Sequence, residues 1–109
     1  MRYRELRYPC DTDLLILLDG SRRQARLVNL GHTGARVEGL GTIPRGSAVT
    51  ISHIGALYPA TVIWSNPQRA GLRFWQRLTA AQVSALRQVS AHDGKGWLAP
   101  AAGGFREMA

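Results

Sequence analysis

The sequence predicts an all-β domain: a six-stranded antiparallel barrel followed by one C-terminal α-helix. Short apolar or alternating segments recur about every ten residues with turn residues between them, which is typical of small closed barrels. Beyond residue 79 the spacing of apolar residues changes from two to three, which indicates a helix. A chain of 109 residues has room for only one hydrophobic core.

The six strands are predicted from apolar runs, alternation and the turns that separate them. Asp19-Gly20 lies between two apolar stretches and favours a hairpin, because both residues tolerate a positive φ. In the second strand, alternation places Ala25, Leu27 and, by the same count, Asn29 on one face. In chain order, the predicted strands cover residues 14–18, 24–29, 35–38, 48–54, 58–64 and 71–75.

The helix is predicted to begin at a capping box. Thr79 is the expected N-cap, with Gln82 reaching back to its backbone. Val83, Leu86 and Val89 follow at spacings of three, so they form a core-facing stripe on a helix of about three turns.

This pattern predicts that the chain is divided into two parts. Residues 1–91 are predicted to form the barrel domain, including an arginine-bearing N-terminal arm and the helix. Residues 92–109 are rich in glycine and also contain Pro100, so we expect a flexible tail.

The charge balance indicates an anionic partner. There are 14 basic residues against 7 acidic ones, for a net charge of +7. All the basic residues except Lys95 are arginines, and arginine pairs well with phosphates and guanine edges. Nucleic acid, an anionic membrane surface and a phosphorylated small molecule all fit this charge. An arginine bias can also reflect codon usage alone.

Several classes of protein are excluded or disfavoured. The only cysteine, Cys10, cannot form an internal disulfide, and we expect it to be structural. The longest apolar run has five residues, far fewer than the roughly 20 that a membrane helix needs. The charged N-terminus lacks a signal-peptide core, so we expect a cytoplasmic protein without membrane insertion.

Catalysis is not expected either. His32, His53 and His92 lie far apart, and the acidic residues form no pair suited to acid–base chemistry. No nucleophile-elbow motif surrounds any serine. We therefore predict a binding protein with no metal and no cofactor.

Two features flank the first hairpin and suit an anionic, guanine-containing ligand. The N-terminal segment carries Arg2, Arg4 and Arg7, whose side chains could grip phosphates or stack on bases. Asn29 offers a donor and an acceptor to a base edge, and glycines at 31 and 34 let backbone amides approach a ligand. Purely structural roles remain open: a frayed terminus, and a tight connection with Gly34 in a left-handed conformation.

With these features in this order, the chain resembles the PilZ domain family of bacterial cyclic di-GMP receptors, over about residues 2–90. The segments that carry the resemblance are Arg4-Glu5-Leu6-Arg7-Tyr8-Pro9, residues 27–37 (LVNLGHTGARV), residues 60–64 (ATVIW) and residues 70–74 (AGLRF). The resemblance implies a six-stranded barrel with a C-terminal helix, binding one or two cyclic di-GMP molecules across the N-terminal arm.

The family's ligand pattern is RxxxR in the arm and [D/N]xSxxG after the second strand, and this chain departs from it twice. Arg7 matches the second arginine, but Tyr3 occupies the position of the first. Asn29 and Gly34 match, but Gly31 replaces the serine. That change removes a hydroxyl group and leaves an exposed amide. The residues implied to bind cyclic di-GMP are Arg4, Arg7, Asn29, Gly31 and Gly34, with a possible arm contribution from Arg2.

Two other functions remain open. The chain could be a degenerate PilZ adaptor that binds proteins and no nucleotide, an interpretation supported by Tyr3, Gly31 and the tail residues Trp97, Leu98 and Phe105. A small basic barrel for single-stranded nucleic acid is less favoured, because aromatic residues make up only 7% of the chain and stacking platforms would be few. For a receptor, the resemblance implies a protein partner in motility, adhesion or polysaccharide synthesis.

Overall fold

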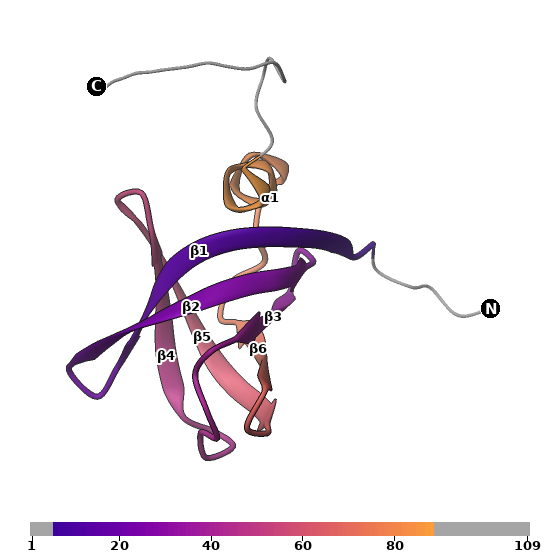
Figure 1. The fold of residues 1–109 in the computed structure, drawn as a ribbon. Coiled ribbons are helices and arrows are strands. Elements are labelled where there is room, and N and C mark those ends of the chain that lie inside the picture. The colour runs from indigo at the N-terminus through magenta and orange to yellow at the C-terminus, as the bar shows by residue number, and fades with distance from the viewer. Residues whose placement is uncertain (1–5, 89–109) are drawn as a thin grey trace.

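The computed structural model describes residues 6–88, which form a closed antiparallel barrel with one helix packed beside it (Figure 1). Around the barrel the strands follow the order β1-β2-β3-β6-β5-β4, and β1 pairs with β4 to close it. The predicted fold class is confirmed. The elements are β1 Tyr8–Leu18, β2 Ser21–Leu30, β3 Gly34–Glu38, β4 Ala48–His53, β5 Ala56–Ser65, β6 Arg69–Phe74 and α1 Ala80–Arg87.

Strand β1 begins at Tyr8, six residues earlier than the apolar run predicted. The alternation continues through polar residues: Asp11 and Asp13 face solvent, whereas Thr12 is fully buried. Thr12 takes a core position because its Oγ1 donates a hydrogen bond to the carbonyl oxygen of Leu86 in α1, at 2.7 Å. A buried hydroxyl is acceptable where it has such a partner.

The β1–β2 and β4–β5 hairpin turns have different residues at their left-handed positions. The β1–β2 turn is formed by Asp19 (φ 49°) and Gly20 (φ 79°), as the sequence predicted. The β4–β5 turn is formed by Ile54 (φ 46°) and Gly55 (φ 77°). A β-branched residue is rarely found in a left-handed conformation, and the Ile54 side chain is 84% exposed. The second turn is therefore strained and displays an apolar side chain to solvent.

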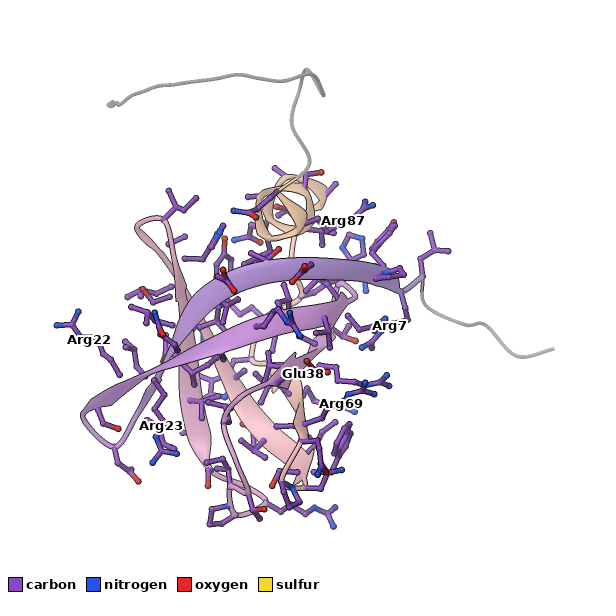
Figure 2. The ribbon with its side chains drawn as sticks, viewed as in Figure 1. Arg7, Arg22, Arg23, Glu38, Arg69 and Arg87 are labelled. Carbon is purple, nitrogen blue, oxygen red and sulfur yellow. The ribbon has the colours of Figure 1, made fainter. Side chains whose placement is uncertain are left out.

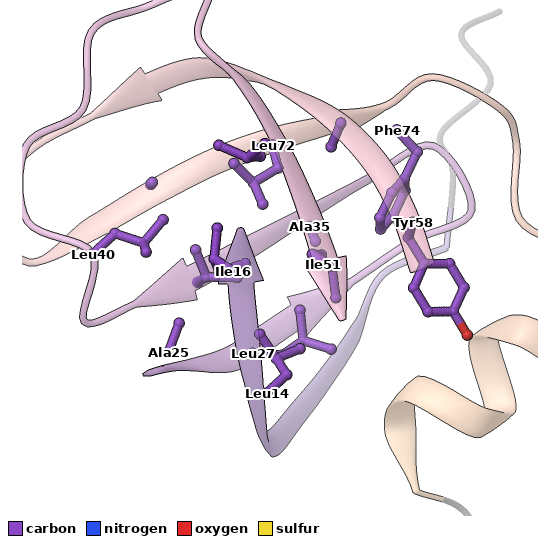
Figure 3. Close-up of a cluster of buried hydrophobic side chains, with 14 of the residues drawn as sticks. Leu14, Ile16, Ala25, Leu27, Ala35, Leu40, Ile51, Tyr58, Leu72 and Phe74 are labelled. Carbon is purple, nitrogen blue, oxygen red and sulfur yellow. The ribbon is translucent and has the colours of Figure 1, made fainter. Parts of the chain in front are cut away.

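The barrel interior is filled with aliphatic side chains from all six strands (Figure 3). Tyr58 and Phe74 pack edge to face, with ring centroids 6.5 Å apart, and Tyr58 lies at the end of the core that faces α1 (Figure 3). The largest fully buried aliphatic side chains are Ile16, Leu27, Leu30, Ile51, Leu72, Leu86, Val37 and Val62.

Helix α1 begins at the predicted capping box. The Thr79 amide donates to Gln82 Oε1 at 2.8 Å, and the Gln82 amide donates to Thr79 Oγ1 at 3.1 Å. Val83 and Leu86 are buried, as the stripe predicted. The helix is shorter than expected: it spans eight residues and ends at Arg87, because Gln88 turns into a left-handed conformation. Residue 89, the last of the predicted stripe, lies outside the described residues.

The helix end also contacts the start of β1. The guanidinium carbon of Arg87 lies 4.2 Å from the ring centroid of Tyr8, which is a cation–π geometry. Together with the Thr12 hydrogen bond, this contact fixes α1 against β1. Within residues 6–88 the structure contains no helix with the length and apolar character to span a membrane. The expected flexible tail, residues 92–109, lies outside the described part of the chain.

Candidate ligand-binding site

Arg7 and Asn29 meet at one end of the β1–β2 pair. Pro9 pairs with Asn29, which places Arg7 beside the end of β2. Alternation predicted that Asn29 shares a face with the buried Leu27, but a register irregularity between these residues turns Asn29 outward. Arg7 Nε then donates a hydrogen bond to Asn29 Oδ1 at 2.8 Å. The two terminal nitrogens of this guanidinium bond to nothing else within residues 6–88.

Gly34 is required because another part of the backbone approaches it closely. A Cβ at this position would lie 2.7 Å from the carbonyl oxygen of Leu72 on β6, closer than real Cβ contacts allow. Gly34 is not among the residues with positive φ in the described chain, so the interpretation of a left-handed glycine is wrong. The missing side chain instead lets β3 lie directly against β6.

Gly31 has a different position from the one expected. It is buried, and its amide donates to the carbonyl oxygen of Gly34 at 2.9 Å. The expectation of an exposed amide is therefore wrong, because the turn uses this donor itself. Gly31 also does not line the hollow beside Arg7 and Asn29.

Three predicted site residues, Arg7, Asn29 and Gly34, line one open hollow of about 410 Å³. Arg36 on β3 and Arg73 on β6 also line it, so three guanidinium groups surround the same space. No aspartate or glutamate lines the hollow. Such a site attracts anions, because arginine pairs with phosphate in two parallel hydrogen bonds.

An aromatic side chain forms one wall of the hollow. A register irregularity between Val62 and Trp64 turns Trp64 outward, opposite Gly71 on β6. A Cβ at Gly71 would overlap the indole ring, so the ring can lie flat on the strand only because residue 71 is glycine. The guanidinium carbon of Arg36 lies 6.0 Å from the centroid of the Trp64 ring. An exposed indole beside arginines is suited to stacking on a base.

The sequence pattern did not predict a ligand role for Arg36, Trp64 or Arg73. A usable signal exists for Arg36, which lies two positions after Gly34 on the same strand and therefore shares its face. Arg73 pairs directly with Gly34 across β3 and β6, and this register could not be known before the strand order. Arg2 and Arg4 lie outside the described residues, so the structure does not place them.

The β2–β3 turn is also hydrogen-bonded to the end of β6 and to the segment that follows β6. The Phe74 amide donates to the carbonyl oxygen of Thr33 at 2.8 Å, and the Leu78 amide donates to that of His32 at 2.8 Å. In a third contact, His32 Nδ1 lies 2.8 Å from the carbonyl oxygen of Leu78, which is hydrogen-bond distance. We call these contacts the His32–Leu78 bracket. The turn that contains Gly34 is therefore held by the residues that lead into α1.

Most of the remaining arginines lie away from the hollow. Arg22 and Arg23 are at the far end of β2, near the β1–β2 turn (Figure 2). Arg26 and Arg69 both bond to Glu38, at 2.9 and 3.0 Å, and these hydrogen bonds lower the pKa of Glu38. Much of the net charge is thus part of the exposed surface.

Groups capable of catalysis or metal binding do not gather elsewhere in the described chain. Cys10 is half-buried, and burial raises the pKa of its thiol, which disfavours a reactive thiolate. Within residues 6–88 no three His, Cys, Asp or Glu side chains are placed to hold a metal ion.

Together, the closed barrel and its arginine-lined hollow define a small binding domain whose site is suited to an anionic ligand. The model of the PilZ domain family matches residues 1–92, so the chain belongs to the PilZ domain family. This is a family of cyclic di-GMP-binding or related signalling modules, which bind ligands or partners and are not catalysts. No curated protein sequence matches the chain.

Proposed function

We propose that this chain is a receptor for cyclic di-GMP, which it binds in the hollow between the start of β1 and the outer face of β3 and β6. Arg7, Asn29 and Gly34 occupy the family's motif positions and line this hollow. Arg2 and Arg4 add positive charge to the same arm of the sequence. The output would pass to a protein partner in motility, adhesion or polysaccharide synthesis.

The hydrogen bond between Arg7 Nε and Asn29 Oδ1 is the observation that carries this proposal. It holds the guanidinium at the rim of the hollow and leaves both terminal nitrogens without a partner within residues 6–88. A guanidinium oriented in advance loses less side-chain entropy when it binds a phosphate or the O6/N7 edge of guanine. The ligand offers two phosphates and two guanines to such a group.

Arg36, Arg73 and Trp64 support the same ligand class. The two arginines give the hollow a positive field that no acidic side chain in its wall offsets. The exposed Trp64 ring offers a flat surface to a purine, and stacking on an aromatic ring contributes about 1–3 kcal/mol per base. These residues compensate for part of what Tyr3 and Gly31 remove from the family pattern.

Calorimetric titration of the full chain with cyclic di-GMP tests the proposal. Arg7→Ala should weaken binding by about 10- to 100-fold, because a hydrogen bond to a charged group contributes about 1.5–3 kcal/mol. Arg22→Ala removes the same charge at the far end of β2 and is the matched control, with little effect expected. The absence of both heat and chemical-shift change at about 200 µM ligand would refute binding. Equal affinities for Arg7→Ala and the unaltered chain would refute the assigned role of Arg7.

The alternative function is an adaptor that binds protein partners and no nucleotide. The position of Gly31 favours it, because this residue is buried and its amide is already bonded within the turn. Replacing Gly31→Ser and Tyr3→Arg restores the family pattern and discriminates the two functions. A receptor should bind cyclic di-GMP before the change and about tenfold more tightly after it, since one hydrogen bond contributes about 0.5–1.5 kcal/mol. An adaptor should bind only after the change.

A further inference from the structure

The outward face of β5 has an unusual composition for a small antiparallel barrel. In such a sheet, residues on the solvent side are normally polar. Here the inward positions are apolar, and four of the five outward positions are apolar as well. The outward positions are Leu57, Pro59, Thr61, Ile63 and, after the register irregularity, Trp64. Leu57 is 62% exposed, which indicates an interaction surface and not a misplaced core residue.

A second hollow, of about 420 Å³, lies beside Leu57 and Pro59, and the ring of Trp75 forms part of its wall. Trp75 is 62% exposed. Its Nε1 nevertheless donates to Thr61 Oγ1 at 2.9 Å, and its amide donates to the Pro59 carbonyl oxygen at 3.0 Å. The indole is therefore held in one position while its surface stays accessible. Rigid, exposed tryptophans are typical anchors of protein interfaces.

The strained turn residue belongs to the same end of the barrel. Ile54 is three residues before Leu57 in the β4–β5 hairpin and combines a left-handed backbone with 84% exposure. Asparagine or glycine would suit this backbone better. Ile54 lines a neighbouring hollow beside α1, which shares Tyr58 with the hollow beside Trp75. A strained, exposed apolar residue next to this surface is consistent with a role in binding.

Charge identifies the kind of partner. Residues 39–92 contain no aspartate or glutamate, and the four acidic residues of the described chain lie on β1, β3 and the β1–β2 turn. Arg77 lines the hollow beside Trp75. A second copy that met this face with the same face would bring arginine against arginine. One arginine in the hollow is also too few for an anionic membrane, which attracts clusters of basic residues.

We propose that Ile54, Leu57, Pro59, Trp75 and Arg77, here called the Leu57–Trp75 surface, bind a segment of a partner protein that combines apolar and acidic side chains. Its apolar residues pack on Leu57 and Trp75, and its carboxylates pair with Arg77. This inference is independent of nucleotide binding, because none of these residues lines the hollow that contains Arg7.

Selection of random peptides of about 12 residues against the immobilised full chain tests the proposal. Enriched peptides should contain Asp or Glu together with Leu, Phe or Trp. Leu57→Ser and Trp75→Thr should each weaken the best peptide by about tenfold or more in fluorescence anisotropy. Arg77→Glu should also weaken binding of the best peptide. The same variant should bind more tightly a peptide in which lysines replace Asp and Glu. Leu6→Ser is the matched control, because Leu6 is 67% exposed and does not line the hollow beside Trp75.

The following results would overturn the proposal. One is the absence of an enriched peptide family, and another is a preference for basic peptides. A third is equal loss of binding in Leu57→Ser and Leu6→Ser. Dimerisation in sedimentation velocity, or binding to phosphatidylglycerol vesicles, would identify a different occupant if Leu57→Ser abolished it. Cyclic di-GMP titration of Leu57→Ser in the absence of peptide separates the two sites, because Leu57 does not line the hollow that contains Arg7 and the nucleotide affinity should stay unchanged.

Discussion

The hollow that contains Arg7 and the hollow beside Trp75 both use strands β5 and β6, yet their shapes have opposite origins. The hollow that contains Arg7 depends on missing side chains: Gly34 lets β3 approach β6, and Gly71 lets the Trp64 ring lie on the strand. The Leu57–Trp75 surface depends on side chains that are present and held in place. The first region should therefore be damaged by adding atoms, and the second by removing them.

The largest expected effect comes from adding one methyl group to the first region. Gly34→Ala should lower the free energy of unfolding by about 1–3 kcal/mol, because its Cβ would meet the backbone oxygen of Leu72 and cannot be relieved by a side-chain rotation. Urea denaturation followed by circular dichroism measures this change.

Gly55→Ala is the control in the second region. A Cβ there meets nothing within 4 Å, although its φ is +77°, so only backbone strain of about 1 kcal/mol opposes the change. If the two variants lose equal stability, steric contact with β6 is not what distinguishes the first region.

The next effect has the opposite sign. Ile54→Asn should raise the free energy of unfolding by about 1 kcal/mol, because Asn-Gly suits two left-handed residues in a hairpin turn. The same variant should weaken the acidic, apolar peptide. A thermal melt measures the gain in stability, and the peptide titration measures the loss of affinity. An unchanged melting temperature would show that Ile54 is not strained.

The smallest expected effect is a pH dependence of the folding stability, and it comes from His53, which lies below α1. His53 is 7% exposed, and its Nε2 has no hydrogen-bond partner within the described chain. Burial lowers the pKa of His53 below its ordinary value of 6.5. The unfolded chain therefore binds a proton more readily than the folded one, and stability falls as the pH falls below about 6.5.

Comparison of urea midpoints at about pH 7.5 and about pH 5.5 measures this loss. His53→Leu should show a smaller decrease over the same interval, because the titrating group is gone. Tyr58 faces the same space below α1, and burial raises the pKa of its phenol, so it stays neutral throughout. An equal decrease in both proteins would assign the pH dependence to other groups.

Much of the fold was predictable because apolar alternation follows directly from burial on one face of a strand. The alternation of Val49, Ile51 and His53 identified β4, and the capping box identified the start of α1. The early part of β1 was missed because its inward residue, Thr12, is polar. Its hydrogen bond to Leu86 joins residues 74 positions apart, and no local pattern reveals such a partner.

The candidate site was predictable in part. Arg7, Asn29 and Gly34 were predicted from their chemistry and from the family pattern, but the reason for Gly34 was not, because the close approach of Leu72 depends on the strand order. Trp64 and Arg73 join the hollow through register irregularities and pairing between distant strands. Neither the register irregularities nor the pairing of distant strands can be predicted from the sequence alone.

The His32–Leu78 bracket has a thermodynamic consequence. It connects the turn beside the first hollow to residues 74–78, which also line the second. If nucleotide binding shifts this bracket and changes the affinity for a partner, partner binding must change the affinity for the nucleotide by the same factor. The partner's abundance would then set the concentration of messenger to which the cell responds.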